Sequence, residues 1–335
     1  MSARLEVAGL RVRFDTDEGS VLAVNGVSFA LRPGGVLGLV GESGCGKSVT
    51  AMALLGLLPP TAAAEGSVRL DGRELVGLPQ RELRQIRGRE ISMIFQEPMT
   101  SLNPAFTVGF QIAEVLRRHE GLKRVPAWER ATELLDLVRI PEPGKRVGEY
   151  PHQMSGGMRQ RVMIAMAVAC NPKVLLADEP TTALDVTIQA QVLDIMRDLR
   201  EQLGTSIVLI THDLGVVADI AEDVVVMYAG HVVESGGVDT VFANPRHPYT
   251  IGLLGSVPRP DIGAAEGGGR LREIPGFVPT LREPPAACVF APRCARADAV
   301  CQDGMPPLSE QGPGQYAACV HPGPAAVTAS GGAHE

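Results

Sequence analysis

The sequence has few aromatic residues and few lysines. Phe, Trp and Tyr make up 4% of the 335 residues, so the core must be aliphatic, drawn from a composition that is 45% hydrophobic. Only four of the 31 basic residues are Lys, and the formal net charge is −7 without any basic block. A protein that binds nucleic acid usually carries a positive face. The composition therefore argues against nucleic acid as a partner.

Long hydrophobic runs are also missing. A helix that crosses a bilayer needs about 18 or more consecutive apolar residues, and the longest candidate, residues 51–58, stops at Pro59. Residues 1–14 alternate apolar and charged side chains, unlike a signal peptide. We therefore expect a cytosolic, reduced chain. If it works at a membrane, other subunits must cross that membrane.

Short apolar runs predict buried strands at residues 36–40, 174–177 and 206–210. Runs without alternation suit a parallel sheet that is covered on both faces. Between the last two runs, apolar residues recur at helical spacing from Val192 to Leu199, and Gly204 provides a stop. This strand–helix–strand order predicts an α/β fold.

The middle and the end of the chain differ from this pattern. Residues 97–160 contain helical stretches at 114–120 and 128–138 and no clear strand, which predicts a helical insertion. Residues 1–96 and 161–245 then form the α/β core.

The C-terminal region, residues 246–335, is predicted to be a separate small module. After the Gly/Ala-rich spacer at 261–270, the chain is rich in Pro and Cys and has little periodicity. The last stretch, 323–335, is expected to be disordered.

A phosphate-binding loop follows the first predicted strand. The sequence GESGCGKS satisfies G-x-x-x-x-G-K-[ST], in which glycines let backbone N–H groups point at anionic oxygens and the next helix adds positive potential. Lys47 is predicted to neutralise the β- and γ-phosphates, and the Ser48 hydroxyl to bind Mg²⁺. A Gly-rich turn with a chance Lys is the alternative. The predicted contacts are Gly41, Glu42, Ser43, Gly44, Cys45, Gly46, Lys47, Ser48 and Val49.

Two adjacent carboxylates, Asp178 and Glu179, end the second predicted strand. Ligands bind at the carboxyl ends of strands in open parallel sheets. Asp178 is suited to hold Mg²⁺, and Glu179 to polarise the attacking water of a phosphoryl transfer. Capping of the next element would be an equal explanation in isolation, but a phosphate loop in the same chain favours catalysis.

A second possible anion site is the helix start at Ser155. This residue can act as an N-cap, and Gly156 and Gly157 leave N–H groups open at the beginning of an apolar helix. An ordinary capped helix is the alternative interpretation of this segment.

Together these motifs resemble the ABC ATPases, whose fold is a RecA-like P-loop NTPase core with a helical subdomain. Met154–Met158 is similar to the signature LSGGQ, Gln96 matches the Q-loop glutamine, residues 183–185 match the D-loop with Asp185, and His212 matches the switch histidine. These elements occur in the family's order within residues 1–245.

The resemblance implies an ATP sandwich. The nucleotide on Lys47 of one subunit is closed over by Ser155, Gly156 and Gly157 of another, His212 touches the γ-phosphate, and Gln96 links the metal and the water to membrane subunits. Phe14 is our choice for the residue that stacks on adenine, with Val21 or a backbone contact as alternatives.

Two positions depart from the family pattern. Met158 stands where the signature usually has Gln, but the phosphate-contacting serine and glycines are intact, so function should survive. Cys45 lies in the phosphate loop, where only its backbone N–H is needed, and its thiol is expected to be open to oxidation.

Other segments resemble the oligopeptide/dipeptide importer subfamily, which also includes nickel and some sugar importers. They are residues 97–104, 244–250 and 274–279, and a tail with the spacing Cys-x₅-Cys-x₆-Cys-x₁₇-Cys. This resemblance implies two transmembrane permease subunits, a second, paralogous ATPase subunit, an extracytoplasmic substrate-binding protein, and a peripheral location on the cytoplasmic face of the inner membrane.

Rival functions fit less well. A soluble ABC ATPase that acts on nucleic acid or ribosomes predicts a long coiled coil or two cassettes, and the sequence has neither. A sensor in which ATP is only regulatory conflicts with the intact Glu179.

The four tail cysteines, Cys288, Cys294, Cys301 and Cys319, indicate a cross-link, through disulfides or a bound metal group, that stabilises a module with little core of its own. Disulfides are disfavoured in a reduced compartment, and structural zinc prefers closely spaced Cys pairs. Loosely spaced thiolates can hold a 4Fe–4S cluster, and the family resemblance points the same way; zinc or free cysteines remain alternatives. Cys170, on the apolar helix, is predicted to be a small core residue.

Overall fold

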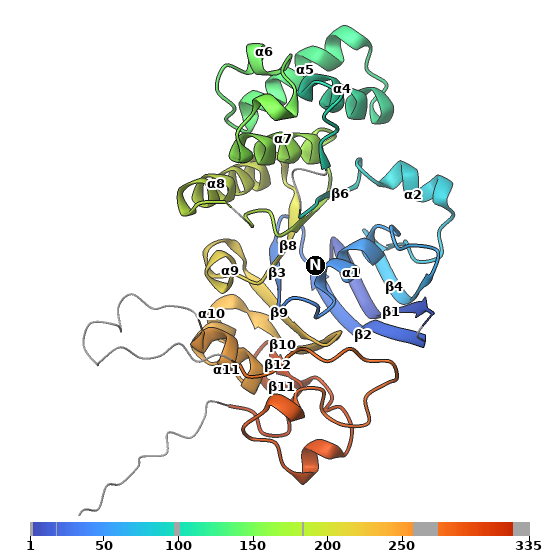
Figure 1. Cartoon of the computed structure of the whole chain (residues 1–335), viewed down its shortest axis with the longest axis vertical. Coiled ribbons are helices and arrows are strands. Elements are labelled where there is room, and N and C mark those ends of the chain that lie inside the picture. The colour runs from blue at the N-terminus through green and yellow to red at the C-terminus, as the bar shows by residue number, and fades with distance from the viewer. Residues whose placement is uncertain (1–2, 18, 97–100, 183, 257–273, 324–335) are drawn as a thin grey trace, which may run out of the picture.

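The computed structural model describes residues 3–17, 19–96, 101–182, 184–256 and 274–323 (Figure 1). Several sequence predictions fall outside these ranges. They concern the first part of the 97–104 motif, Ala183 of the predicted D-loop, the spacer at 261–270 and the stretch at 324–335.

Within the described residues, the larger sheet has eight strands in the order β11-β12-β10-β9-β3-β8-β7-β6. The strands from β9 to β6 pair in parallel, and β10, β12 and β11 continue the sheet in antiparallel pairs. This confirms the predicted α/β fold. The bounds are β3 (Val36–Val40), β6 (Ile91–Ile94), β7 (Val174–Asp178), β8 (Ser206–Thr211), β9 (Asp223–Tyr228), β10 (His231–Gly237), β11 (Ser309–Gly312) and β12 (Gln315–Ala317).

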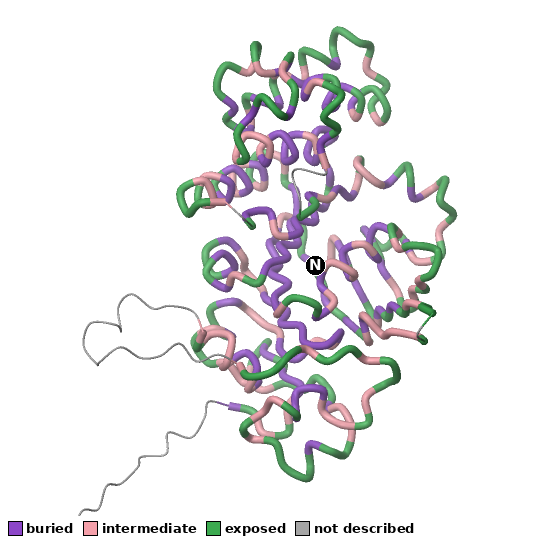
Figure 2. Tube along the Cα trace, viewed as in Figure 1, coloured by how far each residue is buried: buried purple, intermediate pink, exposed green. Residues whose placement is uncertain are grey.

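The central strands are covered on both faces, as their unalternating sequences predict. Every residue of β3, β7 and β8 is buried (Figure 2). On β8, Ile207 and Leu209 pack with the helices α7 (Gly156–Val168) and α8 (Val186–Leu203). Val208 and Ile210 pack in a cluster with α1 (Lys47–Leu54) and the smaller sheet. Gly204 ends α8 in the left-handed conformation, which confirms the predicted stop.

The smaller sheet is antiparallel and has the order β2-β1-β4-β5. Its strands β1 and β2 pair along nearly their whole length, with Phe14 opposite Val21. The alternation of buried and exposed residues on β1 shows that one face packs on the core and the other faces solvent. The bounds are β1 (Leu5–Thr16), β2 (Gly19–Leu31), β4 (Ala62–Leu70) and β5 (Arg73–Glu74), and the short helix α2 (Gln80–Ile86) follows.

The middle of the chain is helical, as predicted, and its helices are longer than the sequence suggested. In Figure 1 they lie at one end of the molecule, above the central sheet. Ile112 of α4 and Leu134 of α5 pack in one apolar cluster with Val162 of α7 and Leu175 of β7. The helical layer and the core therefore share their packing. The bounds are α4 (Val108–His119), α5 (Arg124–Leu137), α6 (Pro143–Arg146) and the 3₁₀ turn η1 (Pro151–Gln153).

The C-terminal tail is less separate than its composition suggested. Its strand β12 pairs with β10, placing Ala317 opposite Glu234, so the tail extends the central sheet. Phe290 of the tail packs with Tyr228 of β9 and Tyr249 of α11. The boundaries of a distinct C-terminal module stay a prediction. The preceding elements are α9 (Leu214–Ile220), α10 (Val238–Ala243) and α11 (Pro248–Gly255), and the tail adds η2 (Ala291–Arg293) and η3 (Ala299–Gln302).

Among the described residues, no helix combines the length and the apolar character needed to cross a bilayer.

Candidate functional site

The predicted phosphate loop connects the end of β3 to the start of α1, as a cradle of this kind requires. Its glycines are needed for space as well as for conformation. A Cβ on Gly41 would lie 2.2 Å from the Met227 carbonyl oxygen, and one on Gly46 would lie 2.4 Å from that of Ala23. Gly46 also caps α1 with a φ of 101°. The loop is therefore pressed against two neighbouring backbones, which fixes its shape.

Lys47 lies inside this loop and is 6% exposed. Its ammonium group donates hydrogen bonds to the carbonyl oxygens of Gly41, at 2.7 Å, and Glu42, at 2.9 Å. The charge is thus held at the centre of the loop, where an anionic oxygen can replace a carbonyl partner.

The expectation that the Cys45 thiol is open to oxidation is wrong. The residue is completely buried, and this burial raises the pKa of the thiol above its usual value despite the nearby Lys47. A buried thiol that stays protonated is a poor nucleophile. Cys45 instead packs in the apolar cluster under the loop.

Asp178 and Ser48 come together at the end of β7. Burial raises the pKa of the Asp178 carboxyl group above its usual value, although the neighbouring Ser48 hydroxyl and Lys47 lower it. Within the described structure, the carboxylate oxygen Oδ1 of Asp178 is buried without a hydrogen-bond partner. A buried, unpartnered carboxylate oxygen beside a hydroxyl suits a hard divalent cation such as Mg²⁺, which binds oxygen ligands.

Glu179 gathers the other predicted catalytic residues around one carboxylate. Its Oε1 lies 3.0 Å from His212 Nδ1, and its Oε2 accepts hydrogen bonds from Gln96 Nε2 at 2.9 Å and Thr182 Oγ1 at 2.8 Å. Burial alone would raise the pKa of Glu179, but the bonds to Thr182 and His212 outweigh it and hold the pKa below its usual value. The group is therefore a carboxylate at neutral pH. Its backbone φ of 47° marks a strained position, as is common at functional sites.

These groups face an open cavity of about 580 Å³. The phosphate loop, Gln96, Glu179 and His212 line one part of it. The remaining wall consists of residues from α11 and the tail that sequence reasoning did not assign to the site: Leu253, Ser256 and Ile274. The only sequence signal was that they follow or fall within the two segments, 244–250 and 274–279, that resemble the peptide-importer subfamily.

The residues predicted to act on a second subunit lie elsewhere. Ser155 caps α7 by accepting a hydrogen bond from Met158 N at 3.3 Å, which confirms the predicted cap. Ser155 and Gly156 are exposed, and a Cβ on Gly156 would meet nothing within 4 Å. Asp185 likewise caps α8, accepting from Ile188 N at 2.9 Å. The start of α7 is thus open to another molecule.

Phe14 is half-buried on β1 and packs against the apolar cluster that contains Cys45 and Val49. This contact places Phe14 near the phosphate loop and α1. The same contact, however, is what an ordinary packing residue would make. Its role in binding adenine stays a prediction.

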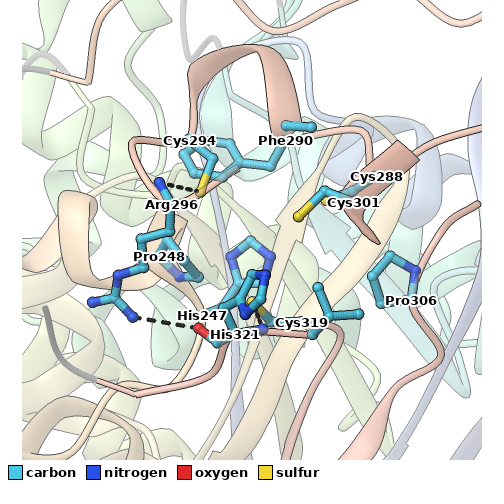
Figure 3. Close-up of a pocket in the computed structure, with 12 residues that line it drawn as sticks. His247, Pro248, Cys288, Phe290, Cys294, Arg296, Cys301, Pro306, Cys319 and His321 are labelled. Carbon is cyan, nitrogen blue, oxygen red and sulfur yellow. Dashed lines mark hydrogen bonds between the residues drawn. The ribbon is translucent and has the colours of Figure 1, made fainter. Parts of the chain in front are cut away.

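All four tail cysteines line one pocket, together with His247, Phe290 and His321 (Figure 3). Backbone N–H groups point at two of the sulfurs: Arg296 N lies 3.4 Å from Cys294 Sγ, and His321 N lies 3.3 Å from Cys319 Sγ. The structure therefore brings together the cysteines that the sequence spreads over the tail.

A tighter group of ligand atoms includes only one of these thiols. Asp298, Cys301 and His321 have ligand atoms within 4.8 Å of one another, the only such trio among the described residues. Cys170, in contrast, is buried beside the helical cluster, and burial raises the pKa of its thiol to about 11. This confirms it as a core residue.

A phosphate loop after a buried strand, paired carboxylates on the neighbouring strand and a helical layer that presents an open helix start define a P-loop ATPase of the ATP-binding cassette class. The model of the family described as "ABC transporter" matches residues 24–182, and that described as "Oligopeptide/dipeptide transporter, C-terminal region" matches residues 233–301.

Curated relatives match over nearly the whole chain. The oligopeptide transport ATP-binding protein OppD of Salmonella typhimurium is 52% identical over 95% of this chain and 93% of its own. OppD of Bacillus subtilis is 53% identical over 91% and 85%, respectively. The dimeric ABC transporter cassette MJ0796, solved with ADP and phosphate, has a TM-score of 0.63 at 29% identity and covers 70% of this chain and 98% of its own. The chain belongs to the ATP-binding subunits of ABC transporters, in the oligopeptide/dipeptide family, and is an ATP hydrolase coupled to transport.

Proposed function

We propose that this chain couples ATP binding and hydrolysis to the import of dipeptides and oligopeptides. The observation that carries the catalytic part is the Glu179 carboxylate, which holds Gln96 and His212 beside the phosphate loop. The substrate class rests on the relatives, which are named as oligopeptide transport proteins. Import of nickel or another small solute by the same machinery is the alternative.

The residues divide the chemistry of hydrolysis among them. Lys47 exchanges its loop carbonyls for phosphate oxygens, and the loop N–H groups bind the same anion. Asp178 and Ser48 would hold Mg²⁺, which would supply charge neutralisation for the phosphates. Glu179 orients the attacking water and accepts its proton as the water oxygen bonds to the γ-phosphorus and the β–γ bridging bond breaks, leaving ADP and phosphate. Gln96 and His212 hold that carboxylate in position.

Completion of the site requires a second ATPase subunit in this proposal. The start of α7, with Ser155 and Gly156 exposed, offers N–H groups and a positive helix end to the triphosphate of a neighbouring subunit. We propose a paralogous partner, as the family resemblance implies, with Asp185 and the D-loop at the same contact.

Contact with the permease subunits is proposed at a groove of about 330 Å³ between β6 and α7. Its lining is largely apolar and includes Phe95, Met163 and Met166, and Phe95 is 45% exposed. Phe95 directly precedes Gln96, which donates to Glu179. A displacement of Phe95 by a cytoplasmic permease segment would therefore be transmitted through Gln96 to the Glu179 carboxylate. This contact would hold the chain at the cytoplasmic face of the inner membrane.

A transport assay tests this function. Co-expressed with its permease and binding-protein partners, the chain should copurify with the permeases and support ATP-dependent uptake of labelled peptides into vesicles. Phe95→Asp should remove both properties while ATP binding persists, because a charge replaces the apolar contact in the groove. Val125→Asp, which changes a residue that is 66% exposed on α5, is the matched control. Uptake of Ni²⁺ and not of peptide would contradict the substrate class, and normal copurification of Phe95→Asp would contradict the groove.

We further propose that Cys288, Cys294, Cys301 and Cys319 hold a 4Fe–4S cluster. The shared pocket and the N–H groups directed at sulfur suit such a group. Zinc is the alternative, but Zn–S bonds of about 2.3 Å would place four sulfurs about 3.8 Å apart. Among the described residues, the compact group of three ligand atoms includes only the Cys301 thiol, so no three of the thiols lie as close together as zinc would hold them. The bound group would order the tail.

Metal analysis of anaerobically purified protein checks this assignment. About four iron and four sulfide ions per chain are expected for one cluster. Cys301→Ser should lose them and lower the melting temperature, because an ordering ligand is removed, whereas Cys170→Ser should retain them. One tightly bound zinc ion without iron would overturn the cluster.

A further inference from the structure

One side chain beside the tail cysteines, that of Arg293, reaches the phosphate loop. Arg293 ends η2 and directly precedes Cys294. Its two terminal nitrogens lie 2.7 Å and 3.1 Å from the two carboxylate oxygens of Glu42, the second residue of the loop. This is a bidentate ion pair between residues 251 positions apart in sequence. The ion pair joins the pocket that the four tail cysteines line, called the cysteine pocket below, directly to the nucleotide site.

The guanidinium group is fixed on its remaining sides. Its Nε donates to the Pro275 carbonyl at 2.8 Å, and a terminal nitrogen donates to the Ile274 carbonyl at 3.0 Å. It also lies 5.6 Å from the centre of the Tyr228 ring, and its side chain is only 6% exposed. A buried charge with a full set of partners is held in one geometry, and loss of one partner is costly. Arg293 therefore forms a rigid connection between η2 and Glu42 of the phosphate loop.

A second contact from the C-terminal part of the chain holds the same loop residue. The backbone N–H of Glu42 donates to the Tyr249 hydroxyl at 2.8 Å. The Tyr249 ring packs against Tyr228 and Phe290, with centroids 4.8 Å and 5.5 Å away. Both the side chain and the backbone of Glu42 are thus anchored outside the loop. The Glu42 carbonyl in turn accepts the Lys47 hydrogen bond, so its position bears on the charge that meets phosphate.

We propose that Arg293 is a positioning residue that transmits the state of the cysteine pocket to the phosphate loop. When the four thiols are ligated, η2 is fixed, Arg293 holds Glu42, and the loop keeps the shape that binds ATP. When a thiol is unligated, η2 is less constrained and the contact of Arg293 with Glu42 is weakened. ATP then binds more weakly. This inference rests on the proposed nucleotide and cysteine sites and adds regulation of one by the other.

The physical basis is a short, continuous chain of rigid contacts. Arg293 is one peptide bond from Cys294, and the backbone N–H of Cys288 donates to the Cys301 carbonyl at 2.9 Å, so the turns that carry the thiols are tied together. Coupling between sites is carried by such packed and hydrogen-bonded connections, and commonly changes affinity by about 5- to 150-fold. The interaction of Glu42 with Arg293 lies at the nucleotide end of this connection.

Binding of the non-hydrolysable analogue AMP-PNP to the full chain, purified anaerobically, tests the proposal by calorimetry. Arg293→Gln should weaken binding by about five- to tenfold, with the iron and sulfide content unchanged. Arg293→Lys should recover part of the affinity, since it keeps the charge without the bidentate geometry. Arg130→Gln, which removes an exposed ion pair with Glu133 on α5, is the matched control and should bind as the wild type does.

A double-mutant cycle distinguishes transmission from local support. Cys319→Ser, which removes a thiol far from Arg293 in sequence, should weaken AMP-PNP binding by a similar factor. The double variant Arg293→Gln/Cys319→Ser should bind no more weakly than either single variant, because both changes break the same connection. Wild-type affinity in Arg293→Gln, or two effects that multiply, would overturn the inference. Binding of AMP-PNP by the wild type supports the proposed function in either case, so the two proposals are judged separately.

Discussion

Replacement of Glu179 by Gln is expected to lower ATP turnover by at least about a hundredfold while ATP binding stays nearly unchanged. The carboxylate is the proposed acceptor of the water proton, and an amide cannot accept it. The amide has the same shape, and its oxygen can still receive the hydrogen bond from Gln96 or Thr182. The depressed pKa of Glu179 means that the wild-type group is ionised at neutral pH, so the variant removes a charge that is present during turnover.

Phosphate release under saturating ATP measures turnover, and AMP-PNP calorimetry measures binding. Glu201→Gln, an exposed change on α8, serves as the control for a loss of one carboxylate charge. Hydrolysis at the wild-type rate in Glu179→Gln would refute its assignment as the base. Loss of both turnover and binding would show instead that Glu179 supports the loop.

Local signals in the sequence were sufficient for much of the fold. The run at 36–40 became β3 with the predicted bounds, and Gly204 ended α8 as expected, because strand burial and a left-handed helix end depend on adjacent residues. The pairing of β12 with β10 was not predictable in this way. That contact joins residues about 80 positions apart, and the tail has no alternation that indicates a strand partner.

In the candidate site, too, residues recognised from local sequence patterns differ from those whose contacts come from distant parts of the chain. The phosphate loop and Asp178–Glu179 were recognisable from residue type and spacing, whereas Gln96 and His212 were assigned by resemblance and then found on the Glu179 carboxylate. The Arg293 contact with Glu42 was missed because no motif relates the two segments. Cys45 was misjudged because exposure depends on the neighbouring strands and helix, and these are distant in sequence.

The exposed start of α7 provides the second large expected effect. Gly156→Asp places a carboxylate where the proposed partner's triphosphate would bind. Within the isolated chain, this change should be tolerated, since a Cβ at Gly156 meets nothing within 4 Å and an acidic residue in the first turn of a helix is stabilising. Across the subunit contact, however, like charges would oppose each other in a site that excludes water.

We therefore expect Gly156→Asp to fold normally and bind AMP-PNP normally, yet to lower the ATP turnover of the assembled transporter by about a hundredfold. This estimate corresponds to about 2.7 kcal/mol of lost stabilisation in the transition state. Gly144→Asp is the matched control, because Gly144 is also exposed near a helix start with nothing within 4 Å of its Cβ position. Association of the ATPase subunits in the presence of ATP, measured by light scattering, should be lost in Gly156→Asp alone. Full turnover and association would mean that the triphosphate is not met by this helix start, and that Ser155 serves only as the cap of α7.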